Sequence, residues 1–223
     1  MIIYQTTKEN NDGKSIVIGL FEDKTLDSDV ISNNKRLQSL ISDKAFKKTV
    51  GHLEKVYTMG ALKSDIIYFV GLGKSDQFDK DVLKQALIGL RTVIFEPLCI
   101  YVETFTGALK LDDVVKTLVL SLDYNSYRYI ELTDKHEKQE ANICLYSKEN
   151  IQNIINEYDY VAKTVSHVRD LVNKPYNYLN ASDLAKYSQD LVASLNDKKT
   201  NVDILGLEDI KKLNMNAFLA VNK

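Results

Sequence analysis

Short apolar runs and alternating apolar and polar positions mark strand-like segments along the chain, and longer amphipathic segments lie between them. These patterns predict strands at Ile2–Gln5, Ser15–Phe21, Ile66–Gly71, Leu98–Val102, Val115–Leu122 and Ala141–Tyr146. The segment Val115–Leu122 is ambiguous, because the apolar run from Leu111 opens with Asp112-Asp113 and fits a helix equally well. Strands that alternate with helices indicate an α/β layer structure with a mixed sheet.

Two helices are predicted between these strands. Asp79–Phe95 carries apolar residues at i, i+3, i+4 and i+7 spacing, which gives one apolar stripe. Pro97 then prevents the helix from continuing and leads into the next strand. The pattern over Lys35–Val50 is also helical, although its periodicity is weaker.

A longer helix is predicted near the middle of the chain. Helical spacing persists over Ile151–Val172, with Ser147 or Asn150 as the N-cap. We place a domain boundary at the start of this helix, which separates a first domain of residues 1–149 from residues 150–223. A helix in this position is expected to hold the two domains in a fixed relation.

The last fifty residues contain further short elements. Pro175 breaks the long helix, because proline disfavours helix at the preceding residue and has no N–H to donate. Asn180 and Asp183 then form a capping-box-like start for a new helix. The pattern after it predicts a strand at Asn201–Leu205, a short helix from Leu207 to Leu213, and a buried strand at Ala217–Val221.

Composition narrows the class of protein. A chain of 223 residues with 44% hydrophobic content is long enough for one large or two small globular domains. The net charge of −2 argues against a nucleic-acid partner. No apolar run is long enough to span a membrane, and the N-terminus lacks the layout of a signal peptide. Cys99 and Cys144 lie in apolar stretches, so we favour buried free thiols over a disulfide and expect a cytoplasmic location.

Candidate binding chemistry along the chain is sparse. The run Gly71-x-Gly73-Lys74 follows a strand and could cradle a phosphate, but it lacks the full dinucleotide and P-loop patterns, so we favour a tight turn. No histidine stands in a metal-binding pattern, and we expect each to be a surface or half-buried residue. The histidines are His52, His136 and His167.

Two motifs near the end of the chain carry a family resemblance. The first, R-D-L-V-N-x-P-x-N, is matched by Arg169, Asp170, Leu171, Val172, Asn173, Pro175 and Asn177. The second, M-x-A-F-L-A-V, is matched by Met215 and Ala217–Val221. With these motifs the segment Val165–Lys223 resembles the leucyl (cytosol) aminopeptidase family, in which Thr-Pro usually stands where this chain has Asn180-Ala181. The first domain resembles that family's macro-domain-like N-terminal domain through Val70–Lys74 and the helix that follows.

We interpret the motif residues Arg169, Asp170, Asn173, Pro175 and Asn177 as structural. The amides of Asn173 and Asn177 could contact substrate, but we favour a role in satisfying backbone groups freed by the helix break before Pro175. Arg169 is expected to pair with an acid in its own helix or across the domain joint.

The resemblance implies an enzymatic parent. The family releases N-terminal residues, preferably leucine, from peptides with two divalent metals, zinc or manganese, which polarise the scissile carbonyl and activate a bridging water. Its ligands and catalytic residues lie in G-K-G-x-T-F-D-S-G-G and N-T-D-A-E-G-R runs, and neither run occurs in this sequence. We therefore assign no catalytic, metal or cofactor-binding residue, and expect these 223 residues alone to be inactive.

Two roles remain open at this point. The interpretation that we favour is that this stretch positions and oligomerises the catalytic part, with the remainder of the catalytic domain and further copies as its partners; the resemblance implies a hexamer. The alternative is a stand-alone macro-like module that binds a nucleotide such as ADP-ribose, or a nucleic acid, without peptidase activity. Fold alone does not decide between them.

Overall fold

The structure, a computed structural model of the 223-residue chain, describes residues 2–7, 14–26, 35, 38–39, 46–132, 139–197 and 199–221. The chain divides into two compact units, Met1–Arg169 and Asp170–Lys223. Within the described ranges, the first unit is a mixed α/β fold built on one sheet, and the second unit is helical. Helix α5 (Gln152–Asn173) runs through the division between them.

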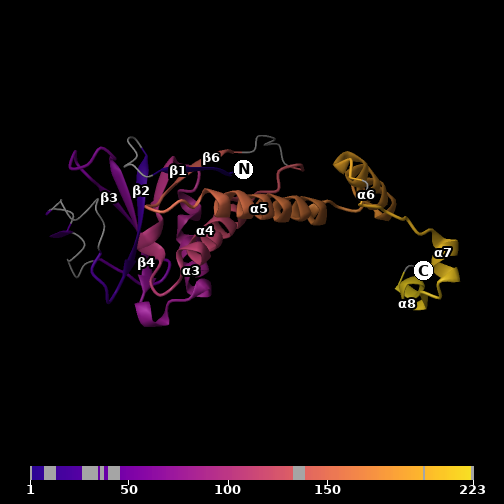
Figure 1. Ribbon diagram of the computed structural model, residues 1–223, viewed down its shortest axis with the longest axis horizontal. Helices are drawn as coiled ribbons and strands as arrows, with labels where there is room; N and C mark the ends of the chain where they lie inside the picture. The colour runs from indigo at the N-terminus through magenta and orange to yellow at the C-terminus, as the bar shows by residue number, and fades with distance from the viewer. Residues whose placement is uncertain are drawn as a thin grey trace. The chain divides into compact units, whose positions relative to one another are not determined.

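The described strands form one mixed sheet in the order β1-β6-β5-β2-β4-β3 (Figure 1). The strands are β1 (Ile2–Thr7), β2 (Ser15–Phe21), β3 (Leu53–Tyr57), β4 (Ile66–Gly73), β5 (Leu98–Tyr101) and β6 (Ala141–Tyr146). All neighbours pair in parallel except β3, which pairs antiparallel with β4 at one edge. Parallel neighbours need crossover connections, and helices supply them between β4, β5 and β6.

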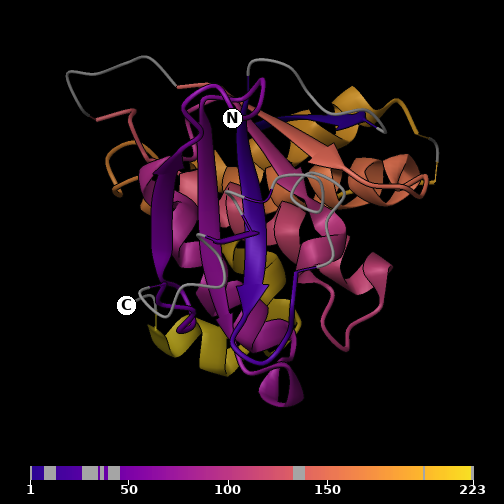
Figure 2. The same cartoon turned by 90° about the vertical axis from the view of Figure 1, so that its left-hand side faces the viewer.

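The helices of the first unit include three short 3₁₀ turns. They are η1 (Ser75–Gln77), α3 (Lys80–Leu87), η2 (Ile88–Thr92), η3 (Val102–Phe105), α4 (Leu111–Ser126) and the greater part of α5. Helices α3 and α4 lie behind the sheet in Figure 2, and their side chains share one buried cluster with residues of the strands.

Both faces of the central strands are buried. Along β2, Val17 joins the cluster on the side of the helices, whereas Ile16 and Ile18 join a second cluster that also contains Cys99 and Cys144. Strands that are covered on both faces have continuous apolar sequences rather than alternating ones. This explains the unbroken apolar run in β2. Cys99 and Cys144 are buried free thiols on neighbouring strands, as expected.

Most of the predicted strands are confirmed. Ile2–Gln5, Ser15–Phe21, Ile66–Gly71, Leu98–Val102 and Ala141–Tyr146 correspond to β1, β2, β4, β5 and β6. Strand β3 was not predicted, because Glu54 and Lys55 interrupt its apolar pattern. An edge strand tolerates such charges, since they discourage pairing with other chains.

The predicted strand Val115–Leu122 is wrong, and the helical alternative is correct. This segment lies within α4, whose first turn carries Asp112 and Asp113. Carboxylates are favourable beside the unpaired N–H groups at a helix start. Leu118 and other side chains of α4 are fully buried, so an almost continuous apolar run is compatible with a helix here.

The predicted helix Asp79–Phe95 is present but shorter. Asp79 is the N-cap of α3 and accepts hydrogen bonds from the N–H groups of Asp81 and Val82. The α-helix ends at Leu87, and η2 continues the chain as a 3₁₀ helix. The predicted helix Lys35–Val50 lies largely outside the described residues.

The second unit contains α6 (Ala181–Leu195), α7 (Leu207–Lys212) and α8 (Asn216–Val221). The predicted capping box is confirmed, because Asn180 and Asp183 exchange side-chain and backbone hydrogen bonds at the start of α6. The predicted strands Asn201–Leu205 and Ala217–Val221 are wrong: the first has no regular structure, and the second lies in α8. A strand needs a neighbour for its backbone groups, whereas a helix satisfies them within itself.

Candidate functional site

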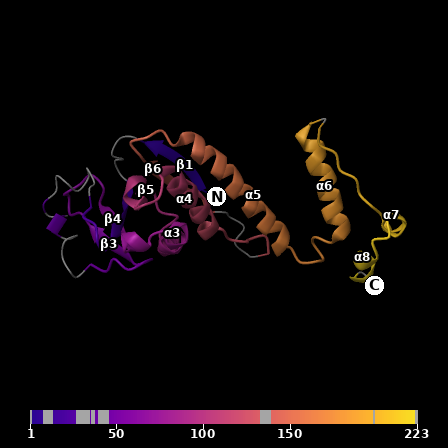
Figure 3. The same ribbon diagram turned by 60° about the horizontal axis from the view of Figure 1, so that its bottom comes forward.

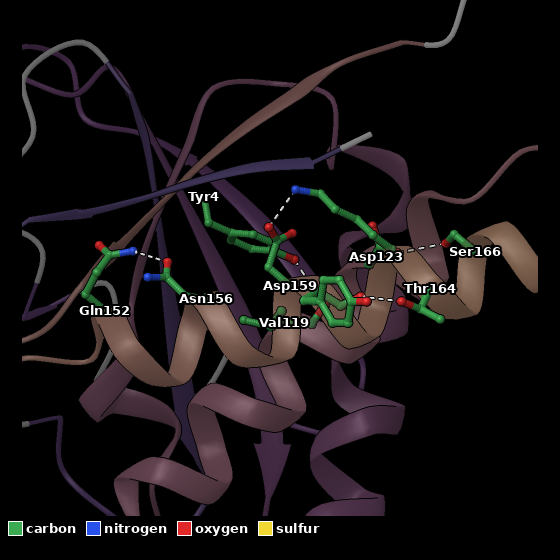
Figure 4. Close-up of polar contacts among 10 residues, drawn as sticks. Tyr4, Val119, Asp123, Gln152, Asn156, Asp159, Thr164 and Ser166 are labelled. Carbon is green, nitrogen blue, oxygen red and sulfur yellow. Dashed lines mark hydrogen bonds and ion pairs between the residues drawn. The ribbon is translucent and has the colours of Figure 1, made fainter. Parts of the chain in front are cut away.

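Helix α5 is joined to α4 by a hydrogen bond within a group of polar residues that we call the α5 anchor: Tyr4, Val119, Asp123, Asp159 and Ser166. The Tyr4 hydroxyl of β1 donates to the carbonyl oxygen of Val119 in α4 at 3.1 Å. The Ser166 hydroxyl of α5 donates to Oδ2 of Asp123 at 2.8 Å. Figure 4 shows these side chains converging between β1, α4 and α5. Figure 3 shows α5 beginning beside β1.

Burial controls the electrostatics of the α5 anchor. Removal of Tyr4 from water raises its pKa well above the usual value, and the negative charges of Asp123 and Asp159 raise it further. Tyr4 is therefore a neutral hydrogen-bond donor at physiological pH. Asp123 is itself buried, and the Ser166 hydroxyl supplies one hydrogen bond to its carboxylate.

Arg169, the first residue of the family motif, lies against the end of α4. Its guanidinium carbon lies 3.8 Å from the ring centroid of Tyr127 and 4.3 Å from that of Tyr124. Its Nη1 also donates to the carbonyl oxygen of Tyr124 at 3.3 Å. The partners seen here are thus aromatic rings and a carbonyl, not the carboxylate that we expected. Stacking on two rings uses the planar shape of the guanidinium.

The other motif residues lie in the second unit. Asp170 and Asn173 belong to the last turn of α5, which ends at Asn173. Pro175 opens a turn, in which its carbonyl oxygen accepts from the N–H groups of Tyr178 and Leu179 at 2.8 and 3.1 Å. Asn177 is exposed within that turn.

A cavity of about 170 Å³ opens where β2 and β5 end. The end of β2 and the turn after it form one wall, and η3 with the following turn forms the other. Lys24 and Glu103 contribute one charge of each sign to its lining. The sequence alone does not reveal this site, because its two walls lie about 80 residues apart and neither carries a known motif.

The glycine run forms the closely packed end of β4, not a turn after that strand as predicted. The Gly71 and Gly73 N–H groups donate to the carbonyl oxygens of His52 and Lys48 at 2.8 and 2.9 Å. A side chain at Gly71 would collide with the carbonyl oxygen of Thr49, and Gly73 has a φ of +71°, which favours glycine. Both N–H groups are engaged by the protein, so they are not directed at a phosphate.

The histidines are dispersed. His52 Nε2 lies 3.0 Å from Oε2 of Glu54 on β3. His167 is exposed on α5, and His136 lies outside the described residues. No group of three or more His, Cys, Asp or Glu side chains in the described ranges is arranged to hold a metal ion. These residues therefore do not fit a metal centre, and no catalytic step through a metal follows from them. No helix in the same ranges has the length and apolar character of a membrane span.

Comparisons with known proteins match this organisation. Residues 17–132 match the cytosol aminopeptidase family, N-terminal domain, and residues 166–223 match the catalytic domain of the same family. A probable cytosol aminopeptidase of Sulfurihydrogenibium sp. (strain YO3AOP1) is 26% identical over 245 aligned residues, which cover 100% of this chain and 47% of that protein. The chain thus spans about half the length of this relative.

Solved structures share the fold. A mutant of tomato leucine aminopeptidase matches with a TM-score of 0.68 and 16% identity, over 96% of this chain and 46% of that one. Cytosol aminopeptidase from Coxiella burnetii matches with a TM-score of 0.65 and 17% identity, over 94% of this chain and 41% of that one. The bottromycin maturation enzyme BotP, solved in complex with Mn, matches with a TM-score of 0.63 and 15% identity, over 82% of this chain and 36% of that one.

The chain therefore combines segments that match the N-terminal domain and part of the catalytic domain of one peptidase family. It belongs to the cytosol aminopeptidase family.

Proposed function

We propose that this chain is the N-terminal portion of a metal-dependent aminopeptidase that releases N-terminal amino acids, preferably leucine, from peptides. The observation that supports this most directly is the match of two successive segments to the two domains of one peptidase family. Residues 1–149 then form the N-terminal domain, and residues 150–223 begin the catalytic domain. The family name and the two buried free thiols support a cytoplasmic location.

The role that we propose for this portion is to position and oligomerise the catalytic part. The α5 anchor and the stacked Arg169 support it, because they fix the helix that leads toward the catalytic segment. Symmetric homo-oligomers are the usual assembled form of soluble enzymes, and a hexamer is our specific expectation. Sedimentation of the 223-residue chain would test it; a monomer at all concentrations would contradict an oligomerising role.

In this proposal the metals, zinc or manganese, are bound outside the described residues, where they would polarise the scissile carbonyl and activate water. The 223-residue chain alone should then leave leucine p-nitroanilide unhydrolysed with either metal. The coding sequence beyond the Lys223 codon should continue into the G-K-G and N-T-D-A-E-G-R runs, and the longer product should hydrolyse the substrate. Chelator-sensitive turnover by the 223-residue chain would contradict the assignment of catalysis to another segment.

A further inference from the structure

The cavity between β2 and β5 lies at a topological switch point of the sheet. After β2 the chain proceeds to β3 and β4 on one side, whereas after β5 it proceeds through α4 to β6 on the other. Ligands of open α/β sheets bind where such connections diverge, outside the carboxyl ends of the strands. Here β2 pairs with β5 only as far as Val17 and continues to Phe21. Beyond this pairing η3 replaces β5 as the neighbour of β2, and the Gly19 N–H donates to the Thr104 hydroxyl at 2.9 Å.

The Glu103 carboxylate is held in place at one wall of this cavity. Its Oε1 accepts hydrogen bonds from the Ser147 hydroxyl at 2.8 Å and from the Lys148 N–H at 2.7 Å. Oε2 makes no hydrogen bond with the part of the chain that the structure describes. Glu103 is therefore a preorganised anion with one oxygen available to a ligand.

Lys24 supplies the opposite charge from the other wall. Its Nζ lies 5.3 Å from the ring centroid of Phe21 and makes no ion pair with a described residue. Leu20, Phe21 and Leu26 contribute apolar lining on the same side. The cavity thus offers a cation, an anion and an apolar surface within one small volume.

This combination matches one chemical class. A cavity of about 170 Å³ is smaller than the roughly 300–1,000 Å³ of sites for drug-sized ligands, and Glu103 would repel a diphosphate, so a nucleotide such as ADP-ribose fits poorly. A single anion or cation would satisfy one wall and face a like charge on the other. A small zwitterion with an apolar side chain satisfies both charges and the apolar lining.

We propose that this cavity binds a free α-amino acid with an apolar side chain, with its carboxylate at Lys24 and its ammonium group at Glu103. The proposal rests on the cavity alone and does not depend on the peptidase function proposed above.

Titration of the 223-residue chain with L-leucine, followed by calorimetry and amide NMR shifts, tests it. We expect saturable binding at millimolar concentrations with shifts near Lys24 and Glu103. Lys24→Gln should weaken leucine at least about tenfold, the effect of one lost charge-assisted hydrogen bond, and leave leucinamide unchanged. Glu103→Gln keeps an acceptor for Ser147 and Lys148, and should weaken leucine and leucinamide alike.

Lys84→Gln and Glu157→Gln, which change exposed charges on α3 and α5, serve as matched controls and should bind leucine as the parent chain does. Absence of leucine binding at millimolar concentrations would overturn the proposal. So would undiminished binding by both cavity variants, or binding of ADP-ribose in place of leucine.

Discussion

The two units of this chain carry similar amphipathic helices, yet they differ in what those helices cover. In the first unit, α3 and α4 bury Leu83, Leu87 and Leu118 completely against the sheet. In the second unit, no described residue of α6, α7 or α8 is buried. Its large apolar side chains are exposed: Leu184, Leu191, Leu195, Leu207, Leu213, Met215, Phe218 and Val221. An apolar stripe specifies which face of a helix requires cover, but not whether the cover lies within the same segment.

Exposed apolar surface on this scale is typical of a face that another part of a protein covers. Residues 166–223 match part of a catalytic domain, and we propose that the remainder of such a domain covers this face. On this account the first unit carries its own stability, whereas the second unit depends on parts outside it. The predictions below test this difference.

The largest effect is expected from a matched pair of Leu→Ala substitutions. Leu118 in α4 is 0% exposed and Leu191 in α6 is 46% exposed. Leu118→Ala removes buried methyl groups and should lower the free energy of unfolding by about 2–5 kcal/mol, whereas Leu191→Ala should change it by less than about 1 kcal/mol. Urea unfolding followed by near-UV circular dichroism of the tyrosines measures both. An equal loss of unfolding free energy in the two variants would contradict this difference between the units.

A smaller effect is expected at the helix that joins the units. Arg169→Ala should cost about 1–2 kcal/mol, because it removes stacking on Tyr124 and Tyr127. Arg169→Lys keeps the charge but loses the planar group, so it should restore only part of this loss. Arg91→Lys, on the exposed surface of η2, is the control and should be neutral in the same urea titration. Full recovery with lysine would show that stacking contributes nothing.

Removal of an N-cap should cost about 1 kcal/mol, and one N-cap in each unit allows the two units to be compared. Asp79 and Asn180 each accept two backbone N–H groups at the start of α3 and α6. Asp79→Ala should lower the urea midpoint of the whole first unit, since α3 is part of its core. Asn180→Ala should leave that midpoint unchanged and raise only the amide exchange rate within α6. A shift of the global midpoint by Asn180→Ala would mean that the two units unfold together.

The smallest effect on stability expected below pH 10 comes from the ionisation of two buried tyrosines of the first unit. Burial raises the pKa of Tyr4 and of Tyr101. The unfolded chain loses these protons from about pH 10, while the folded chain retains them to higher pH. The folded state is therefore fully favoured below pH 10 and loses stability as pH rises above it.

Tyr4→Phe should flatten this alkaline decline. It should also lower stability at neutral pH by about 0.5–1.5 kcal/mol, through loss of the hydrogen bond to Val119. Unfolding titrations between pH 7 and pH 11 measure both changes. An unaltered alkaline slope in the variant would show that ionisation of Tyr4 is not coupled to unfolding.

The first unit was more predictable from sequence than the second, for a physical reason. Within the described chain the apolar run of β2 pairs with that of β4, and the run of β5 pairs with that of β6, so local pattern and tertiary environment agree. At Ala217–Val221 an equally apolar segment was predicted as a strand, but it forms α8, because a strand also needs neighbours that the pattern does not encode. Val115–Leu122 failed differently, since a largely buried helix and a buried strand share the same apolar run.

The candidate site was less predictable than the fold. The motif containing Arg169 was recognisable, yet its aromatic partners come from the end of α4 and have no signal of their own. The cavity depends on the register of β2 and β5, which brings Lys24 and Glu103 to one place. Single charged residues in a sequence do not show that they line the same cavity until the topology of the sheet is known.

Native-state hydrogen exchange, resolved by residue, tests the central claim most directly. If the first unit carries the stability of the chain, amides of β2, β4, β5 and β6 should exchange only through global unfolding. Amides of α6, α7 and α8 should exchange by local opening, with much lower protection that urea hardly changes. Protection of α6 equal to that of β4 would contradict the account, because it would place both units in one cooperative structure.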